Sequence, residues 1–246
     1  MNLALLANPT LLPVAPVSSL TAAIFFKPVD WLTVSFTALD SFGRPDTPGF
    51  DTAFHSPEGT TFITEWDFTV APFGLPGHQR FGLFYSTKEF ALLDQDPLPG
   101  PLALLSILSP TKTRPDDWGI YYNFDQYLYV EEDDPTQGVG LFGRFGWNTG
   151  EANPFETFYS VGVGGKGIVP KRDNDTFGVG YYYLDMSDDI PAMANQHSEQ
   201  GVELYYNFEV TPWLHITPDL QVIIDPGGNS DRDVAIAAGV RAHVTF

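Results

Sequence analysis

The sequence has no cysteine among its 246 residues, which excludes disulfide bonds and thiolate metal sites. It has only 12 lysine and arginine residues against 31 aspartate and glutamate residues, for a formal net charge of −19 at pH 7. Nucleic-acid-binding proteins need a basic surface, so no nucleic acid partner is expected. No uninterrupted apolar run approaches the ~18 residues that a membrane-spanning helix requires. If this chain crosses a membrane, it must do so as strands.

Aromatic residues, glycine and proline are plentiful. Phe, Tyr and Trp make up 15% of the chain, and there are 23 Gly and 21 Pro. This composition supplies strands and turns rather than helices. The length suits one large all-β domain, and we treat residues 1–246 as a single domain.

The last part of the chain alternates apolar and polar residues with a period of two. Apolar side chains recur from Val202 to Val210, again from Leu214 to Ile224, and again from Val234 to the terminal Phe246. Each run predicts a strand with one apolar and one polar face. A closing strand that ends on an aromatic residue is typical of bacterial outer-membrane barrels.

About eleven such runs follow Leu20, and short turns alternate with long loops between them. This order favours an all-β, antiparallel up-and-down transmembrane β-barrel of about 10–12 strands, with the turns facing the periplasm. A soluble Greek-key sandwich has no reason to separate its connections in this way. A closed bacterial barrel has an even strand number, so a further strand is expected to be missing or hidden in residues 1–20.

Residues 1–9 are apolar but carry no lysine or arginine, and they make a poor signal peptide. The start of the chain therefore indicates either a cytoplasmic protein or an N-terminally truncated or processed piece of a larger protein, which would be an incomplete barrel. The two strand faces favour the membrane. Aromatic residues lie near strand ends on the apolar face, as in interfacial girdles: Trp118, Trp147, Tyr159, Tyr181, Tyr183, Tyr206 and Trp213.

Motifs for catalysis, cofactors and metals are absent or weak. Gly162–Gly167 spells GxGxxG, but Pro170 and another strand follow where a dinucleotide site needs a helix. The five histidines show no metal-binding spacing, and the acidic run Glu131–Asp134 is most simply a solvated turn, with calcium as the alternative. No Ser/His/Asp grouping stands out. We expect no enzyme activity, no catalytic residue, no cofactor and no metal site.

Several segments resemble a known family. The run Gly201–Phe208, the Thr211-Pro212-Trp213-Leu214 turn and the Asp225-Pro226-Gly227-Gly228 loop are similar to the C-terminal signature of the carbohydrate-selective, OprB-like porins. Residues 27–32 look like the corresponding upstream hairpin. The resemblance implies a larger sixteen-stranded porin that passes sugars through the outer membrane, of which this chain would be the C-terminal part.

The expected function is passive, sugar-selective diffusion across the outer membrane of a Gram-negative bacterium. A soluble β-rich carbohydrate-binding or structural protein is the alternative. Expected partners are small sugars and outer-membrane lipid, and a homotrimer is left open. Sugars need rings for stacking and polar groups for hydroxyls. The inward-facing residues predicted to line the pathway are Glu65, Asp67, Arg80, Tyr121, Asp125, Phe142, Arg144, Tyr182, Glu203, Tyr205, Asn207 and Arg241.

Overall fold

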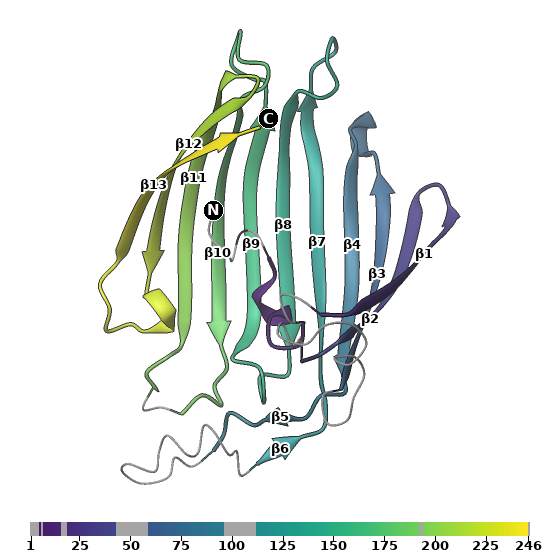
Figure 1. The fold of residues 1–246 in the computed structure, drawn as a ribbon, viewed down its shortest axis with the longest axis vertical. Helices are drawn as coiled ribbons and strands as arrows, with labels where there is room; N and C mark the ends of the chain where they lie inside the picture. Colours follow the sequence, from purple (N-terminus) through teal and green to yellow (C-terminus); the bar gives the residue numbers. More distant parts are fainter. Residues whose placement is uncertain are drawn as a thin grey trace.

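The chain folds into one curved sheet of eleven strands (Figure 1). The computed structural model describes residues 5, 7–15, 19–42, 59–95, 112–191 and 194–245. The strands of the sheet are β1 (Thr21–Val29), β2 (Leu32–Asp40), β3 (Thr60–Val70), β4 (Gly77–Ser86), β7 (Asp117–Val130), β8 (Gly138–Asn148), β9 (Phe155–Lys166), β10 (Thr176–Met186), β11 (Ser198–Thr211), β12 (Leu214–Ile224) and β13 (Ala235–Val244). A separate two-stranded ribbon pairs β5 (Phe90–Ala91) with β6 (Thr113–Arg114).

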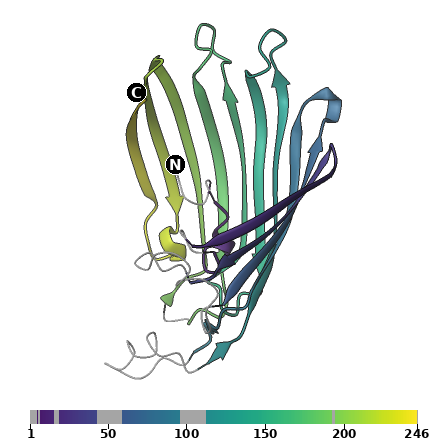
Figure 2. The same ribbon diagram turned by 45° about the vertical axis from the view of Figure 1, so that its right-hand side comes forward.

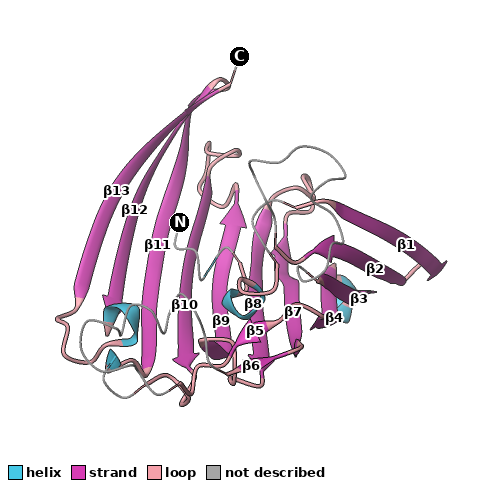
Figure 3. Ribbon diagram, turned by 60° about the horizontal axis from the view of Figure 1, so that its bottom comes forward, coloured by secondary structure: helices cyan, strands magenta, loops and turns pink. Residues whose placement is uncertain are grey.

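Every strand of the large sheet pairs antiparallel with its neighbour in sequence, in the order β1-β2-β3-β4-β7-β8-β9-β10-β11-β12-β13. The sheet bends around a hollow, which is clearest when the molecule is turned (Figures 2 and 3). The all-β, up-and-down prediction is confirmed, and the eleven strands match the number of alternating runs. Among the described residues, β1 and β13 each have one neighbour and therefore form the two edges.

The connections between strands lie at two opposite ends of the sheet, as predicted, but their lengths do not differ between the two ends as clearly as predicted. Tight connections gather at one end of the sheet, the upper end in Figure 1, and the ribbon β5–β6 lies at the other. However, the loop-end connection 149–154 is shorter than the turn-end connection 167–175. Loop 149–154 is bonded to the N-terminal segment, because Asn153 is completely buried and its side chain donates a hydrogen bond to the Thr10 carbonyl. The predicted alternation of short and long connections is therefore wrong at this point.

The first twenty residues contain no strand in their described part. Residues 9–11 form a short 3-10 helix, η1 (Pro9–Leu11). Asn8 caps it, because its side chain accepts from the backbone N–H of Thr10, and Pro9 occupies the first position, where its missing N–H costs nothing. The strand predicted as hidden in residues 1–20 is therefore not found in residues 5, 7–15, 19 and 20.

The convex face exposes large apolar side chains, and within the described residues no second sheet packs over it. Val202, Leu204 and Phe208 on β11 are 44%, 51% and 40% exposed, while Phe246 lies outside the described residues. Neighbouring aromatic rings touch along this face, as do Trp118 and Trp147, whose centroids are 5.4 Å apart. A soluble sandwich would bury these side chains under a second layer. The structure instead has the outward apolar face of a membrane wall.

A buried carboxylate ties the β9–β10 turn to β11. Asp175 is 4% exposed; one of its oxygens accepts from Arg172 at 2.6 Å and from the Tyr206 hydroxyl at 2.8 Å. Its other oxygen accepts from the backbone N–H of Glu209 at 2.9 Å. Burial alone would raise the pKa of Asp175, but these donors favour the anion and hold its pKa below the ordinary value.

The acidic run Glu131–Asp134 forms a turn between β7 and β8, as predicted. Asp134 accepts from the Gln137 side chain and from the hydroxyl and backbone N–H of Thr136. These bonds lower the pKa of Asp134 to about 2. Within the described residues, no group of three or more His, Cys, Asp or Glu side chains is placed to hold a metal ion. In the same residues, no helix is long and apolar enough to cross a membrane.

Candidate functional site

Residues 5 and 7–15, which we call the strap, lie across the concave face of the sheet (Figure 3). The Asn8 side chain donates to the Phe145 carbonyl at 3.2 Å, and the Asn153 side chain donates to the Thr10 carbonyl at 2.8 Å. Farther along, the Thr61 hydroxyl donates to the Val14 carbonyl at 2.7 Å. The strap is thereby hydrogen-bonded to strands or loops at several points along the hollow.

Two apolar clusters fasten the strap at its ends. Leu5 packs with Phe158, Tyr182, Leu184 and Met186. Val14, which is completely buried, packs with Phe84, Phe90, Tyr121 and Ala152. Because side chains from the strap complete both clusters, the strap fills part of the hollow at these two places.

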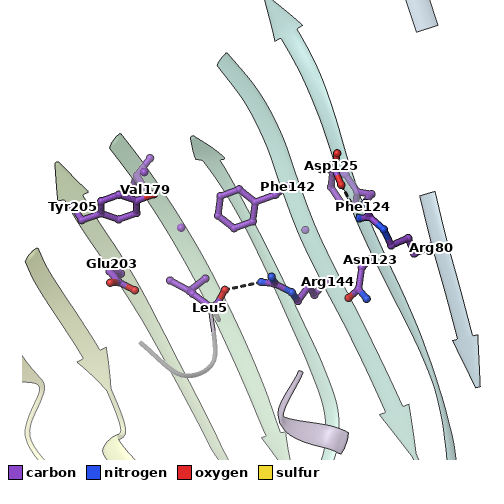
Figure 4. Close-up of a pocket in the computed structure, with 13 residues that line it drawn as sticks. Leu5, Arg80, Asn123, Phe124, Asp125, Phe142, Arg144, Val179, Glu203 and Tyr205 are labelled. Carbon is purple, nitrogen blue, oxygen red and sulfur yellow. Dashed lines mark hydrogen bonds and ion pairs between the residues drawn. The ribbon is translucent and has the colours of Figure 1, made fainter. Parts of the chain in front are cut away.

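Beside the strap lies a cavity of about 310 Å³ (Figure 4). Its walls come from β4, β7, β8, β10, β11 and the strap, so it extends across the middle of the sheet. Charged, aromatic and backbone groups line it: Arg80, Asp125, Arg144, Glu203, Phe142, Tyr205, Leu5, Asn123 and the glycines of β10. Pockets that hold small ligands begin at about this size.

Glycines of β8, β9 and β10 form a patch on the concave face that we call the glycine floor, and Gly178 and Gly180 of this patch line the cavity. Gly140, Gly164 and Gly178 are paired in one row across β8, β9 and β10, and Gly162 pairs with Gly180 in the next row. Because glycine has no side chain, the Phe142 ring can lie against Gly162, where an added Cβ would come within 2.3 Å of the ring. The Tyr205 ring lies against Gly178 in the same way, at 2.5 Å. The glycines therefore allow two rings to rest against the sheet backbone.

Arg80 on β4 is held between two carboxylates. Its Nη1 donates to Asp125 at 2.6 Å, and its Nε lies 3.4 Å from Asp67. The ring of His78 contacts the other oxygen of Asp67 at 2.9 Å. The guanidinium is thus fixed in position, with its charge compensated by two acids.

Arg144 on β8 has a different environment. Its Nη1 donates to the backbone carbonyl of Leu5 at 2.6 Å, as the dashed line in Figure 4 shows. Arg144 shares a cross-strand row with Asn123 and Arg80, since Arg80 pairs with Asn123 and Asn123 pairs with Arg144. The row places two arginines on one side of the cavity.

On the other side of the cavity, Glu203 and Tyr205 come from β11. Glu203 is 3% exposed and pairs in register with Gln221 on β12; two residues farther along β11, Tyr205 pairs with Asp219. Cations and anions therefore occupy different strands of the concave wall. The cavity therefore offers arginine donors together with Asp125 on one side and the acceptor Glu203 on the other.

The structure brings six of the twelve sequence-predicted residues into this cavity: Arg80, Asp125, Phe142, Arg144, Glu203 and Tyr205. Asp67 stands behind Arg80. Glu65 accepts from the Tyr121 hydroxyl at 3.0 Å, and Tyr121 belongs to one of the apolar clusters.

The other three predicted residues lie away from the cavity. Tyr182 is 1% exposed, and its hydroxyl donates to Glu199. The Asn207 side chain accepts a hydrogen bond from the Thr217 hydroxyl at 3.2 Å. Arg241 lies on the edge strand β13, where it pairs with Thr217 of β12. These three are therefore not wall residues of this cavity.

Sequence reasoning missed the strap and the glycine floor. Leu5 contacts Arg144 across 139 sequence positions, and no local period announces a contact of that range. Asn8-Pro9 could have indicated a capped helical turn in place of a strand. Inward glycines at a period of two, such as Gly162 with Gly164 and Gly178 with Gly180, could have indicated a smooth patch on the polar face.

Comparisons with known proteins agree with this arrangement. The family described as "Carbohydrate-selective porin, OprB family" matches residues 1–246. Porin B of Pseudomonas aeruginosa is 27% identical over 200 residues, which are 74% of this chain and 44% of that protein. The chain spans about half the length of the curated relatives that it matches first.

Solved structures show the same fold. The high-pH structure of Pseudomonas putida OprB superimposes with a TM-score of 0.78 at 25% identity, covering 94% of this chain and 60% of that one. The outer-membrane channel DcaP of Acinetobacter baumannii has a TM-score of 0.54 at 13% identity, covering 92% of this chain and 62% of that one. The second likeness concerns the fold alone.

Proposed function

Since the chain belongs to the OprB family of carbohydrate-selective porins, we propose that its concave face forms part of the wall of a sugar-passing channel. The chain is an outer-membrane β-barrel protein, and the family points to a channel rather than an enzyme. The wall is proposed to allow passive diffusion that favours small neutral sugars.

The cavity over the glycine floor carries the proposal. A sugar has apolar ring faces and a rim of hydroxyls, so it is bound by aromatic surfaces together with donors and acceptors. Phe142 and Tyr205 supply the surfaces, while Arg80 and Glu203 supply donors and acceptors from different strands. A channel site must release its solute quickly, so weak contacts of this kind suit passage better than an enclosing pocket.

We also propose that residues 1–246 act as one structural unit of that wall. The sheet has eleven strands in antiparallel order, so β1 and β13 run in the same direction. An antiparallel closure between them takes an odd number of further strands, which also gives the even total typical of bacterial barrels.

The test compares sugar flux in liposomes through the complete barrel, in which further strands join β1 to β13. We expect Phe142→Ala and Tyr205→Ala to slow swelling in a monosaccharide such as glucose, relative to swelling in an amino acid of similar size. Phe145→Ala is the matched control, because Phe145 lies on β8 with its side chain 37% exposed on the opposite face. If both cavity variants keep the parent's preference for sugar, the rings do not form the pathway.

A further inference from the structure

Arg144 is a cation inside the wall without an acidic partner among the described residues. Its hydrogen bond goes to a neutral backbone carbonyl, that of Leu5, and the other charged residue in its cross-strand row is a second arginine, Arg80. Arg80, in contrast, contacts both Asp67 and Asp125. A partly buried charge is costly when nothing of opposite sign compensates it.

Two arginines outside the cavity have acidic partners. Arg114 contacts Asp116 and Glu151, and Arg172 contacts Asp175. The chain as a whole carries 31 acidic residues against 12 basic ones, so acids are abundant. Of the two arginines that line the cavity, Arg80 contacts two acids, whereas Arg144 contacts none among the described residues.

The surroundings of Arg144 define what could compensate it. A guanidinium binds a carboxylate through two parallel N–H···O bonds, and Leu5 occupies one of its nitrogens, Nη1. The Phe142 ring lies on the same wall as Arg144, and Tyr205 and Glu203 lie across the cavity. These groups suit a solute with an apolar ring face or carbon chain and with hydroxyls.

We propose that the cavity binds the carboxylate of a sugar-sized hydroxy acid at Arg144, with the hydroxyl-bearing part of the solute extending over Phe142 toward Glu203. This inference rests on the proposed channel function and specifies a substrate class for it. The channel then passes neutral sugars weakly and holds their acid forms for longer, because only the acid supplies the missing negative charge. Leu5 is a positioning residue, since its carbonyl orients the guanidinium.

The test measures how gluconate, the acid that corresponds to glucose, blocks the current through the complete barrel in planar bilayers. Gluconate is expected to reduce the single-channel current at lower concentration than glucose does. In Arg144→Gln, the concentration for half block by gluconate should rise by about tenfold or more, as expected for loss of one charge-assisted hydrogen bond. Arg144→Lys keeps the charge but loses the fork, so it should lie between the two.

Arg232→Gln is the matched control. It removes the same charge from the β12–β13 connection, where Arg232 donates to the Pro226 carbonyl, away from the cavity lining. Block by gluconate and glucose-driven swelling should both match the parent's in this variant. Equal gluconate block in the parent and Arg144→Gln, with glucose flux intact, overturns the acid site alone. If the parent itself passes no glucose, the proposed channel function is overturned instead.

Discussion

Replacing Gly162 by alanine puts one methyl group under the Phe142 ring, and the structure predicts what that does. The new Cβ would lie 2.3 Å from the end of the ring and 2.7 Å from the Val179 carbonyl oxygen. The ring can lift away, but the backbone carbonyl belongs to the paired strand β10 and cannot. Overpacking of this kind costs about 1–3 kcal/mol.

Gly178 and Gly239 complete a graded series. At Gly178 the three atoms nearest to an added Cβ all belong to the Tyr205 side chain, the first at 2.5 Å, and at Gly239 nothing lies within 4 Å. Gly178→Ala should therefore cost less than Gly162→Ala, and Gly239→Ala should stay within about 0.5 kcal/mol of the parent. All three glycines lie within strands of the same sheet.

The measurement is the unfolding midpoint of each variant in detergent, followed by the shift between folded and heat-denatured mobility on gels. Glucose flux is measured on the same preparations, because a lifted Phe142 ring would narrow the cavity. Equal midpoints for Gly162→Ala and Gly239→Ala would refute the glycine floor as described.

Three further predictions follow from particular contacts. Asp175→Asn should destabilise the protein by about 2 kcal/mol at pH 7, because charge-assisted bonds are lost. Since the pKa of Asp175 is depressed in the folded protein, its contribution is present above the ordinary carboxyl pKa and is lost as pH falls through the depressed one; unfolding midpoints across acidic pH check this. Asn153→Ala should free the Thr10 carbonyl, loosen the strap and raise both protease cleavage there and ion conductance; unchanged cleavage would contradict this. Leu204→Arg should cost about 2–4 kcal/mol and Val210→Arg about 0–1, because Leu204 lies in the middle of β11 and Val210 near its end; equal folding yields in lipid would count against the membrane face.

The wall of this protein could be predicted from the sequence because its signal is local. Alternation such as Val202–Val210 fixes which face of a strand meets lipid, and a one-residue error would reverse every side chain. Inward placement of Arg80, Glu203 and Tyr205 follows directly from that period. The strand boundaries were less certain, since bulges such as the one between Glu209 and Thr211 shift the register without changing composition.

The content of the hollow could not be predicted in the same way. Tyr182 and Tyr205 both face inward, but the first is sealed in a cluster with Leu5 and the second lines the cavity. The difference arises from the strap, which reaches this part of the sheet from the other end of the sequence. Contacts of such range depend on packing in three dimensions, and hydrophobic periodicity carries no information about them.

The claim that the concave face lines a water-filled sugar pathway is tested most directly at two adjacent residues, Leu204 and Tyr205. The chain contains no cysteine, so Leu204→Cys and Tyr205→Cys each provide a single thiol, on opposite faces of β11. In proteoliposomes that contain the complete barrel, a charged, water-soluble thiol reagent should label Tyr205→Cys and leave Leu204→Cys unlabelled. Glucose should slow the labelling of Tyr205→Cys. Equal labelling at the two positions, or labelling of Tyr205→Cys that glucose does not slow, would contradict the account.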